Sequence, residues 1–438
     1  MLPRTTSRLF PIAALLAAAV CAAAAESTES VEFQPGADGA ATVDAAGFES
    51  LQAAFDALPE SGGMVAIPPG RYELAQPLVL SRGDVAIRGA GPATHLVNTN
   101  EEGAPAIRIA PPEGTKALWR IQIADLRVTG NPKSGPGIYA NAVNEVLLSH
   151  VAVEHHGADG VVLDHCYEDP RVCACLITYN AGTGLNLLGC HDIVVSANQF
   201  EENVDALHCV NGYNLTMTGN NVDDHLGNGV VIENTYGSIV SGNMIEECTG
   251  HALVLEGACY GDAISANTFA HCKGEGVRLV GVRDITVSAN TFVLLAEPAL
   301  HALGEAAQLT ITGNTFSRYP FDPRERHTID PGQGIVLEGV RDVTVSGNTF
   351  TAARYEAIKV AGDANMRLCI TGNTILNPSQ GAPGEHAAVA LANVTRSIFA
   401  NNIVTDDQEP PTMKRALELT GDCDLNVMTS NILPGAVQ

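Results

Sequence analysis

Five side chains that could do chemistry recur at nearly constant spacing in the middle of the chain. Four are 23 or 24 residues apart and the fifth follows three residues later: Asp205, Asn228, His251, Glu275 and Arg278. Carboxylates and histidine transfer protons, and arginine clamps carboxylate or hydroxyl groups. If each repeat forms one coil, stacking places equivalent positions about 4.8 Å apart. The spacing therefore predicts a site within roughly 15 Å along the stack, the footprint of a few sugar units.

Further polar residues fall on the same predicted face. In the motif small–apolar–x–apolar, as in Gly276-Val277-Arg278-Leu279, alternation directs the apolar pair inward and x outward. Positions at x, or just before the motif, should line one exposed surface. We assign substrate binding to five of them: Asn186, His208, Asn228, Glu275 and His301.

Paired carboxylates occupy the turns leading into these strands. They are Glu201, Glu202, Asp223, Asp224, Glu246 and Glu247, with His225 and His271 nearby. Aligned carboxylates repel one another unless a cation or protonated histidine offsets them. Two interpretations stay open. One is a Ca²⁺ site, because hard cations prefer several carboxylate oxygens, and the other is a solvated acidic edge that discourages lateral aggregation.

A recurring Gly-Asn or Ala-Asn dipeptide indicates the elements that must position these side chains. Its asparagines are separated by 22 to 34 residues: Asn198, Asn220, Asn243, Asn267, Asn290, Asn314, Asn348, Asn373 and Asn401. A period in this range is typical of a solenoid. Stacked amides can bond from coil to coil, so we interpret these asparagines as structural. Each coil should contain two strands, one with the asparagine and one with the small–apolar motif.

The first 25 residues have the pattern of a secretory signal peptide. Arg4 and Arg8 precede a short alanine-rich stretch, Leu9 to Ala25, with small residues suited to cleavage before Glu26. No later segment is long and apolar enough to span a bilayer. We therefore predict a protein that is secreted or periplasmic after cleavage near Ala25. Residues 26–45 are interpreted as a linker and residues 46–438 as one domain.

Composition narrows the classes of partner. The formal net charge is −25 and becomes −27 once the two leader arginines are removed. Such acidity argues against nucleic acids, and against unassisted binding of a polyanionic glycan. A neutral substrate, or a bridging cation, would remove the second objection. Ten cysteines remain after cleavage, and in an exported protein they could be structural thiols or disulfides.

The N-terminal part of the domain resembles a known family. Phe48, Leu51, Phe55 and Leu58 have the 3–4–3 spacing of a short amphipathic helix, and Gly62-Gly63-Met64-Val65-Ala66-Ile67-Pro68-Pro69-Gly70-Arg71-Tyr72 follows. Together they look like the N-terminal signature of pectate-lyase-like proteins, and the repeats to about residue 433 are similar to those of that superfamily. The resemblance implies an all-β fold: a right-handed parallel β-helix preceded by a short cap helix. It says little about activity, because the superfamily includes lyases, hydrolases, epimerases and non-enzymes.

The register of the polar residues resembles that of the polygalacturonases. That family carries Asn-Thr-Asp, Asp-Asp, Gly-His-Gly and Arg-Ile-Lys on consecutive coils, and this chain has Asn203-Val204-Asp205, Gly227-Asn228, Gly250-His251-Ala252 and Arg278-Leu279-Val280. Asn228 stands where an aspartate would be, and Val280 replaces the lysine. An amide cannot act as the general acid of an inverting hydrolase, so that mechanism is disfavoured.

These observations lead to two hypotheses from different classes. The first is an exported enzyme acting on a polysaccharide by lyase or glycoside hydrolase chemistry, with uronic acid epimerisation less favoured. Asp205 would be acid or base, His251 a proton shuttle or orienting group, and Arg278 a clamp. The second is a non-catalytic β-helix that binds glycans or serves as a surface scaffold. An insertion, Ser317 to Gly332, is predicted to overhang the face as a loop.

Overall fold

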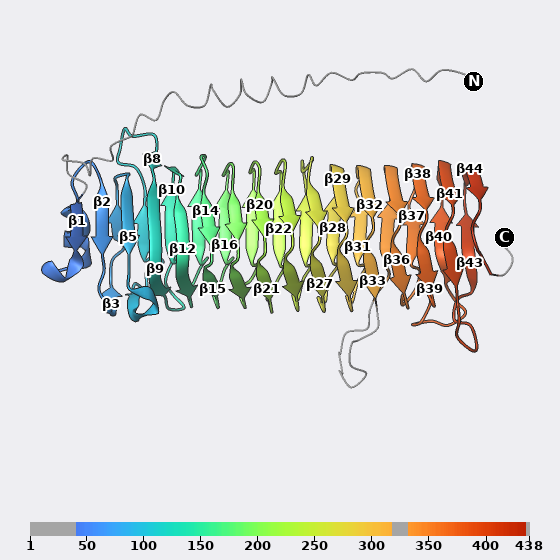
Figure 1. The fold of residues 1–438 in the computed structure, drawn as a ribbon, viewed down its shortest axis with the longest axis horizontal. Helices are drawn as coiled ribbons and strands as arrows, with labels where there is room; N and C mark the ends of the chain where they lie inside the picture. The colour runs from blue at the N-terminus through green and yellow to red at the C-terminus, as the bar shows by residue number, and fades with distance from the viewer. Residues whose placement is uncertain (1–40, 318–331, 435–438) are drawn as a thin grey trace, which may run out of the picture. The chain divides into compact units, whose positions relative to one another are not determined.

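A computed structural model describes residues 41–317 and 332–434 of the chain. The predicted signal peptide, most of the predicted linker and the centre of the insertion lie outside the described residues. No helix among the described residues is long and apolar enough to cross a membrane. The described part is almost entirely β-structure, arranged in coils whose strands stack side by side (Figure 1).

One series of strands forms a fourteen-stranded parallel sheet, in which every strand pairs with the equivalent strand of the next coil. These strands carry the small–apolar motifs. They are β4 (Leu78–Leu80), β7 (Ile107–Ile109), β10 (Ile138–Asn141), β13 (Val161–Asp164), β16 (Leu185–Leu188), β19 (Leu207–Val210), β22 (Val230–Glu233), β25 (Leu253–Glu256), β28 (Val277–Val280), β31 (Leu300–Leu303), β34 (Ile335–Glu338), β37 (Ile358–Ala361), β40 (Ala387–Ala392) and β43 (Arg415–Thr420).

The asparagine-containing runs form a second, twenty-eight-stranded parallel sheet. Most of them split into two short strands, one on each side of the asparagine, so these coils have three strands rather than the two expected. The strands are β1 (Ala41–Asp44), β2 (Gly63–Ala66), β3 (Gly70–Leu74), β5 (Val85–Arg88), β6 (Thr94–Asn98), β9 (Ile121–Thr129), β12 (Leu147–Glu154), β14 (Arg171–Cys173), β15 (Leu176–Thr178), β17 (Val194–Ser196), β18 (Gln199–Glu201), β20 (Thr216–Thr218), β21 (Asn221–Asp223), β23 (Ile239–Ser241), β24 (Met244–Glu246), β26 (Ala263–Ser265), β27 (Thr268–Ala270), β29 (Arg283–Ser288), β30 (Thr291–Val293), β32 (Ala307–Thr312), β33 (Thr315–Ser317), β35 (Arg341–Ser346), β36 (Thr349–Thr351), β38 (Asn365–Thr371), β39 (Thr374–Leu376), β41 (Val394–Ala400), β42 (Ile403–Thr405) and β44 (Asp424–Thr429). A two-stranded sheet joins β8 (Leu118–Trp119) to β11 (Val143–Asn144).

Helical structure among the described residues is brief. It comprises the 3₁₀-helices η1 (Ala45–Gly47) and η2 (Gly91–Ala93) and the α-helix α2 (Leu51–Asp56). Ser50 caps α2 by accepting a hydrogen bond from the backbone N–H of Ala53, and Leu51 and Phe55 are buried. Phe48 lies before the helix and is exposed. The action of α2 as a cap on the first coil remains a prediction, whereas β1 shows that ordered structure begins inside the predicted linker.

The repeated asparagines form a buried ladder. From Asn198 onward, the side-chain Nδ2 of each member donates to Oδ1 of the next at about 3.0 Å, and its own backbone N–H donates to the same Oδ1. This confirms the coil-to-coil bonding predicted from the repeat. One member was assigned wrongly, because the ladder passes from Asn373 to Asn402, not Asn401, and ends at Asn431.

The residue before each ladder asparagine explains the dipeptide. Ala197, Gly219 and Gly242 have φ of 56°, 64° and 67°, in the left-handed region where glycine and small residues are favoured. Asn401 takes the same place with φ of 57°. Asparagine tolerates that conformation, so a second asparagine stands directly before the one that bonds.

The core lies between the sheets as continuous rows of aliphatic and aromatic side chains. Phe269, Phe292, Phe316 and Phe350 stack on successive coils with centroids 4.6 to 5.0 Å apart. The ten cysteines among the described residues are all free thiols. Cys248 lies against Cys272, as expected for equivalent positions of neighbouring coils, and the pKa of the Cys248 thiol is raised by that contact and by burial.

Candidate functional site

The outer face of the fourteen-stranded sheet carries the predicted site. Pairing of Leu207 with Val230, Val230 with Leu253, and Leu253 with Val277 fixes the coils in register. Two residues before each of these positions, the row of candidates runs Asp205, Asn228, His251 and Glu275, one coil apart. The outward row within the strands contains Asn186, His208, Arg278 and His301.

Several positions expected to be exposed on this face are buried. Glu275 is only 6% exposed, and the outward valines Val231 and Val254 are also buried. Neighbouring side chains on adjacent coils cover them, since coils stack at about 4.8 Å. The face is therefore a packed surface with polar groups set into it.

A chain of side chain to backbone hydrogen bonds joins the row. Asp205 Oδ1 accepts from the backbone N–H of Asn228, and Asn228 Oδ1 accepts from that of His251 at 2.9 Å. His251 Nδ1 in turn accepts from the backbone N–H of Glu275 at 3.0 Å. Each of these three side chains thus accepts one hydrogen bond from the backbone of the next coil.

Glu275 is the centre of a polar cluster. Nη1 of Arg278 donates to both carboxylate oxygens at 3.0 and 2.9 Å, and Nδ1 of His301 lies 2.6 Å from Oε1. His251 approaches from the preceding coil. We call these four residues, His251, Glu275, Arg278 and His301, the Glu275 cluster. Asp205 lies two coils from His251, so the structure joins only two of the three residues predicted to be catalytic.

The hydrogen bonds set the two histidines in opposite tautomers. A backbone N–H only donates, so Nδ1 of His251 carries a lone pair and the neutral ring has its proton on Nε2. A carboxylate only accepts, so Nδ1 of His301 carries a proton, and in the neutral ring Nε2 has the lone pair. Glu275 therefore lies between a histidine that accepts at Nδ1 and a histidine that donates at Nδ1, with Arg278 on the strand that follows Glu275.

Electrostatics maintain these states. Burial would raise the pKa of Glu275, but hydrogen bonds from His301 and Arg278 outweigh burial and hold the pKa below its usual value, so the carboxylate is ionised. Burial lowers the pKa of His251, and the charge of Arg278 adds to this effect against the opposing charge of Glu275. His251 is consequently neutral at pH 7.

The other predicted binding residues lie outside the cluster. His208 faces Glu233, with 3.8 Å between Nε2 and a carboxylate oxygen, and Asn186 donates to Asp159 at 3.0 Å. Sequence reasoning missed Glu233 and Glu338; Oε2 of Glu338 lies 3.7 Å from Nε2 of His301. Both glutamates sit two positions after an outward residue on their strands, so period-two alternation could have identified them.

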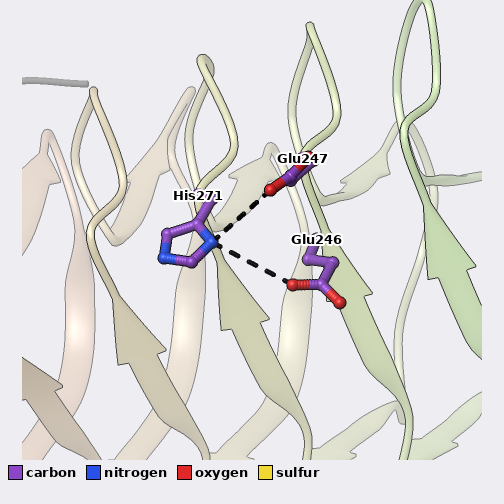
Figure 2. Close-up of side chains that lie close together, drawn as sticks. All are labelled: Glu246, Glu247 and His271. Carbon is purple, nitrogen blue, oxygen red and sulfur yellow. Dashed lines mark ion pairs between the residues drawn. The ribbon is translucent and has the colours of Figure 1, made fainter. Parts of the chain in front are cut away.

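The acidic turn forms the row expected from the sequence. Glu201 pairs in register with Asp223, and Asp223 with Glu246. Burial and neighbouring carboxylates raise the pKa of both Asp223 and Glu246. Figure 2 shows Glu246 and Glu247 directed toward His271, with 4.0 and 3.9 Å between the carboxylates and Nδ1. Their three ligand atoms lie within 4.8 Å of one another, close enough to share one ion. The Ca²⁺ interpretation stays a prediction.

The coil architecture defines the class of the protein. The model of the family described as "Right handed beta helix region" matches residues 136–316 and 299–434, and the chain belongs to this family. The predicted right-handed parallel β-helix of the pectate-lyase-like type is confirmed. No curated protein matches the chain by sequence.

Solved structures share the fold at low sequence identity. The A-module of mannuronan C-5 epimerase AlgE6 from Azotobacter vinelandii is 15% identical, with 89% of this chain and 98% of that one covered and a TM-score of 0.50. Tailspike protein 3 of bacteriophage CBA120 is 14% identical over 82% and 68%, with a TM-score of 0.53. A mutant of the periplasmic alginate epimerase AlgG is 13% identical over 82% and 84%, with a TM-score of 0.50.

Proposed function

We propose that the protein is an exported enzyme that acts on a uronic acid-containing polysaccharide by removing the C5 proton and eliminating the 4-linked sugar. The observation that carries the proposal is the pair of opposed tautomers around Glu275. Proton abstraction next to a carboxylate needs a base and donors that stabilise the charge developing on that carboxylate. The Glu275 cluster contains both within two coil steps.

Each residue has a defined role in this reaction. Nε2 of His301 is buried in the structure, so sugar binding has to expose it before it accepts the C5 proton. The electron pair then forms the C4–C5 double bond, and the C4–O bond breaks with its oxygen taking a proton from water. The Nε2–H of His251 and the outer edge of Arg278 bind the sugar carboxylate. A neutral imidazole that donates is a known way to polarise such a group. Glu275 is a positioning residue, because it fixes His301 and Arg278.

Hydrolysis has less support on this face. An inverting hydrolase needs one protonated carboxylic acid and one carboxylate across the bond. Glu275 is held ionised by Arg278 and His301, and Asn228 is an amide. Of the four candidates Asp205, Asn228, His251 and Glu275, Asp205 is therefore the acidic residue left for that role. Two of the similar structures are named as C-5 or alginate epimerases, a chemistry that also begins at C5, and this is in keeping with the proposal.

The test is a substrate screen on the mature protein. Alginate, pectate and neutral glycans are each incubated with and without Ca²⁺, and unsaturated product absorbance and reducing ends are followed together. We expect unsaturated products from a polyuronate. His301→Gln should lower the rate by at least about 100-fold, because the base is lost. Reducing ends without unsaturated product would overturn elimination in favour of hydrolysis.

A second candidate is a non-catalytic glycan-binding or scaffold β-helix. It is favoured by the coil-to-coil bonds of Asp205, Asn228 and His251, which give each a structural use. Retained glycan binding with no product from any glycan would establish it.

Export and metal binding are separate parts of the proposal. Cleavage near Ala25 is checked by N-terminal sequencing of the protein recovered from outside the cytoplasm. Ca²⁺ would relieve repulsion in the acidic turn and could bridge to an anionic substrate. The midpoint of thermal unfolding should then rise with Ca²⁺ in the wild type but not in Glu246→Gln/Glu247→Gln. An equal rise in both would exclude this turn.

A further inference from the structure

A row of five rings, three exposed and two half-buried, lies in the turns that follow the strands of the fourteen-stranded sheet, at the strand ends opposite the acidic turn. We call it the aromatic stripe: Tyr167, His191, Tyr213, Tyr236 and Tyr260. Bridges pair His191 with Tyr213, Tyr213 with Tyr236, and Tyr236 with Tyr260, so these rings are one coil apart. Neighbouring ring centroids are separated by 4.8, 4.6, 6.3 and 4.7 Å.

The stripe continues into the coil of the candidate site. The guanidinium of Arg283 lies 4.5 Å from the centroid of Tyr260, and the two residues are bridged in register. Arg283 belongs to the same coil as Glu275 and Arg278. A chain held along the rings would therefore reach the coil that carries the Glu275 cluster.

Formation of the core does not account for the rings. Tyr167, Tyr213 and Tyr236 are 41%, 47% and 40% exposed, while the residue immediately before each ring, such as Cys166 or Cys259, is buried and fills the turn. Later coils make the same turn with Ala307, Arg341 and Met366 in the ring position. The coil thus needs no aromatic residue there, and an exposed aromatic row marks an interaction surface.

The surroundings of the stripe select the kind of partner. Glu233, Glu256 and Asp192 lie close to the rings in sequence, so a polyanion would meet like charge. The C–H face of a pyranose stacks on an aromatic ring, and sugar hydroxyls can donate to carboxylates and bond to tyrosine hydroxyls. A polysaccharide repeats one such face per sugar unit, a length comparable with the ring separation. Nucleic acids, whose bases could also stack on the rings, are excluded because their phosphates would be repelled by the same carboxylates.

We propose that the aromatic stripe binds a neutral polysaccharide chain, running along the coil axis with successive sugar units on successive rings. This binding surface is distinct from the Glu275 cluster, and it does not depend on the reaction proposed there. It would hold the protein on a neutral glycan, or on a neutral stretch of a mixed polymer.

The test is binding of soluble neutral glycans, with xylan, mannan and mixed-linkage glucan as probes and alginate as the polyanionic comparison. Affinity electrophoresis and calorimetry should show binding to at least one neutral glycan. Tyr213→Ala and Tyr236→Ala should each weaken it about three- to tenfold, and the double variant more.

Tyr179 provides the matched control. It is 40% exposed and stacks on His155 with 5.1 Å between centroids, but it lies on the acidic edge of the sheet. Tyr179→Ala should leave neutral-glycan binding unchanged. Absence of binding by the wild type to every neutral probe would overturn the proposal. Binding by Tyr213→Ala and Tyr236→Ala equal to that of the wild type would also overturn it. If these variants bind normally but unfold at a lower temperature, the rings stabilise the stacked coils instead.

Discussion

Glu275 and Glu356 occupy the same row of the same sheet, three coils apart, and differ in what surrounds them. Both are 6% exposed. In both, burial would raise the pKa and a histidine hydrogen bond helps to hold it below its usual value. Nδ1 of His386 lies 3.0 Å from Glu356, as Nδ1 of His301 does at 2.6 Å from Glu275.

The partners separate the two regions. Arg278 forms two hydrogen bonds with Glu275, whereas Lys359, three residues after Glu356, acts through its charge. His301 lies on the sheet face, whereas His386 precedes its strand and packs 4.7 Å from the ring of Tyr355. A buried carboxylate with a histidine is thus compatible with a structural role. The arginine and the second histidine of opposite tautomer are what make the Glu275 cluster suited to proton transfer.

The largest expected effect is on activity. Glu275→Gln removes the charge that holds the tautomer of His301 and the position of Arg278, and should lower kcat on the active polyuronate by about 100-fold or more. Glu356→Gln should stay within about twofold. Both rates are measured as unsaturated product formation, with circular dichroism to verify folding. Similar losses in both variants would break the distinction between the two regions.

A substitution that conserves the charge three residues after each glutamate should have an effect of intermediate size. Arg278→Lys keeps the charge but loses the guanidinium nitrogens that remain for the sugar carboxylate while Nη1 bonds Glu275, so KM should rise about tenfold with a smaller change in kcat. The corresponding exchange, Lys359→Arg, should change neither. An unchanged KM in Arg278→Lys would remove the clamp from the proposed reaction.

The smallest expected effect is on stability in acid. A carboxyl whose pKa is lowered by folding stabilises the protein above its unfolded value of 4.5, and this contribution is lost as the pH falls through the folded pKa. The gap in unfolding midpoint between wild type and Glu275→Gln should therefore be full above pH 4.5 and shrink below it. Glu356→Gln should show a smaller gap, because it has fewer charged partners. A gap independent of pH would contradict ionised glutamates.

Two buried histidines also make the stability of every variant depend on pH. Burial lowers the pKa of His156 and His225 to about 4, so the folded state binds fewer protons than the unfolded state between about pH 6.5 and 4. The free energy of unfolding should therefore decrease as the pH is lowered from about 6.5 to about 4, and it should do so equally in all the variants. His225→Asn should reduce that slope in a series of denaturant melts, and an unaltered slope would place the acid sensitivity elsewhere.

The fold could be predicted from the sequence because residues that recur at a constant spacing occupy equivalent positions in stacked coils. The asparagine period and the small–apolar motif were enough for coil register, and register alone placed Asn228, His251 and Glu275 on adjacent coils. The split of each asparagine run into two strands depends on the bend at that residue, and the shift from Asn401 to Asn402 depends on a left-handed backbone. Neither follows from spacing.

The site was less accessible because its chemistry depends on burial and on hydrogen-bond direction. Period-two alternation placed Glu275 on the outer face but could not show that neighbours cover it. His301 looked like one of several exposed polar residues until its bond to Glu275 defined its tautomer. The aromatic stripe was missed because its rings are spaced through turns, where no strand pattern draws attention to them.

The asparagine ladder has a consequence for the integrity of the chain. Each of its bonds joins residues 22 to 34 positions apart in sequence but adjacent in space. A protease that cuts one exposed turn would sever the covalent path while the amides, the sheet pairs and the core rows on either side still held the two fragments together. A nicked molecule should therefore keep the stacking of its coils and the surface that they form.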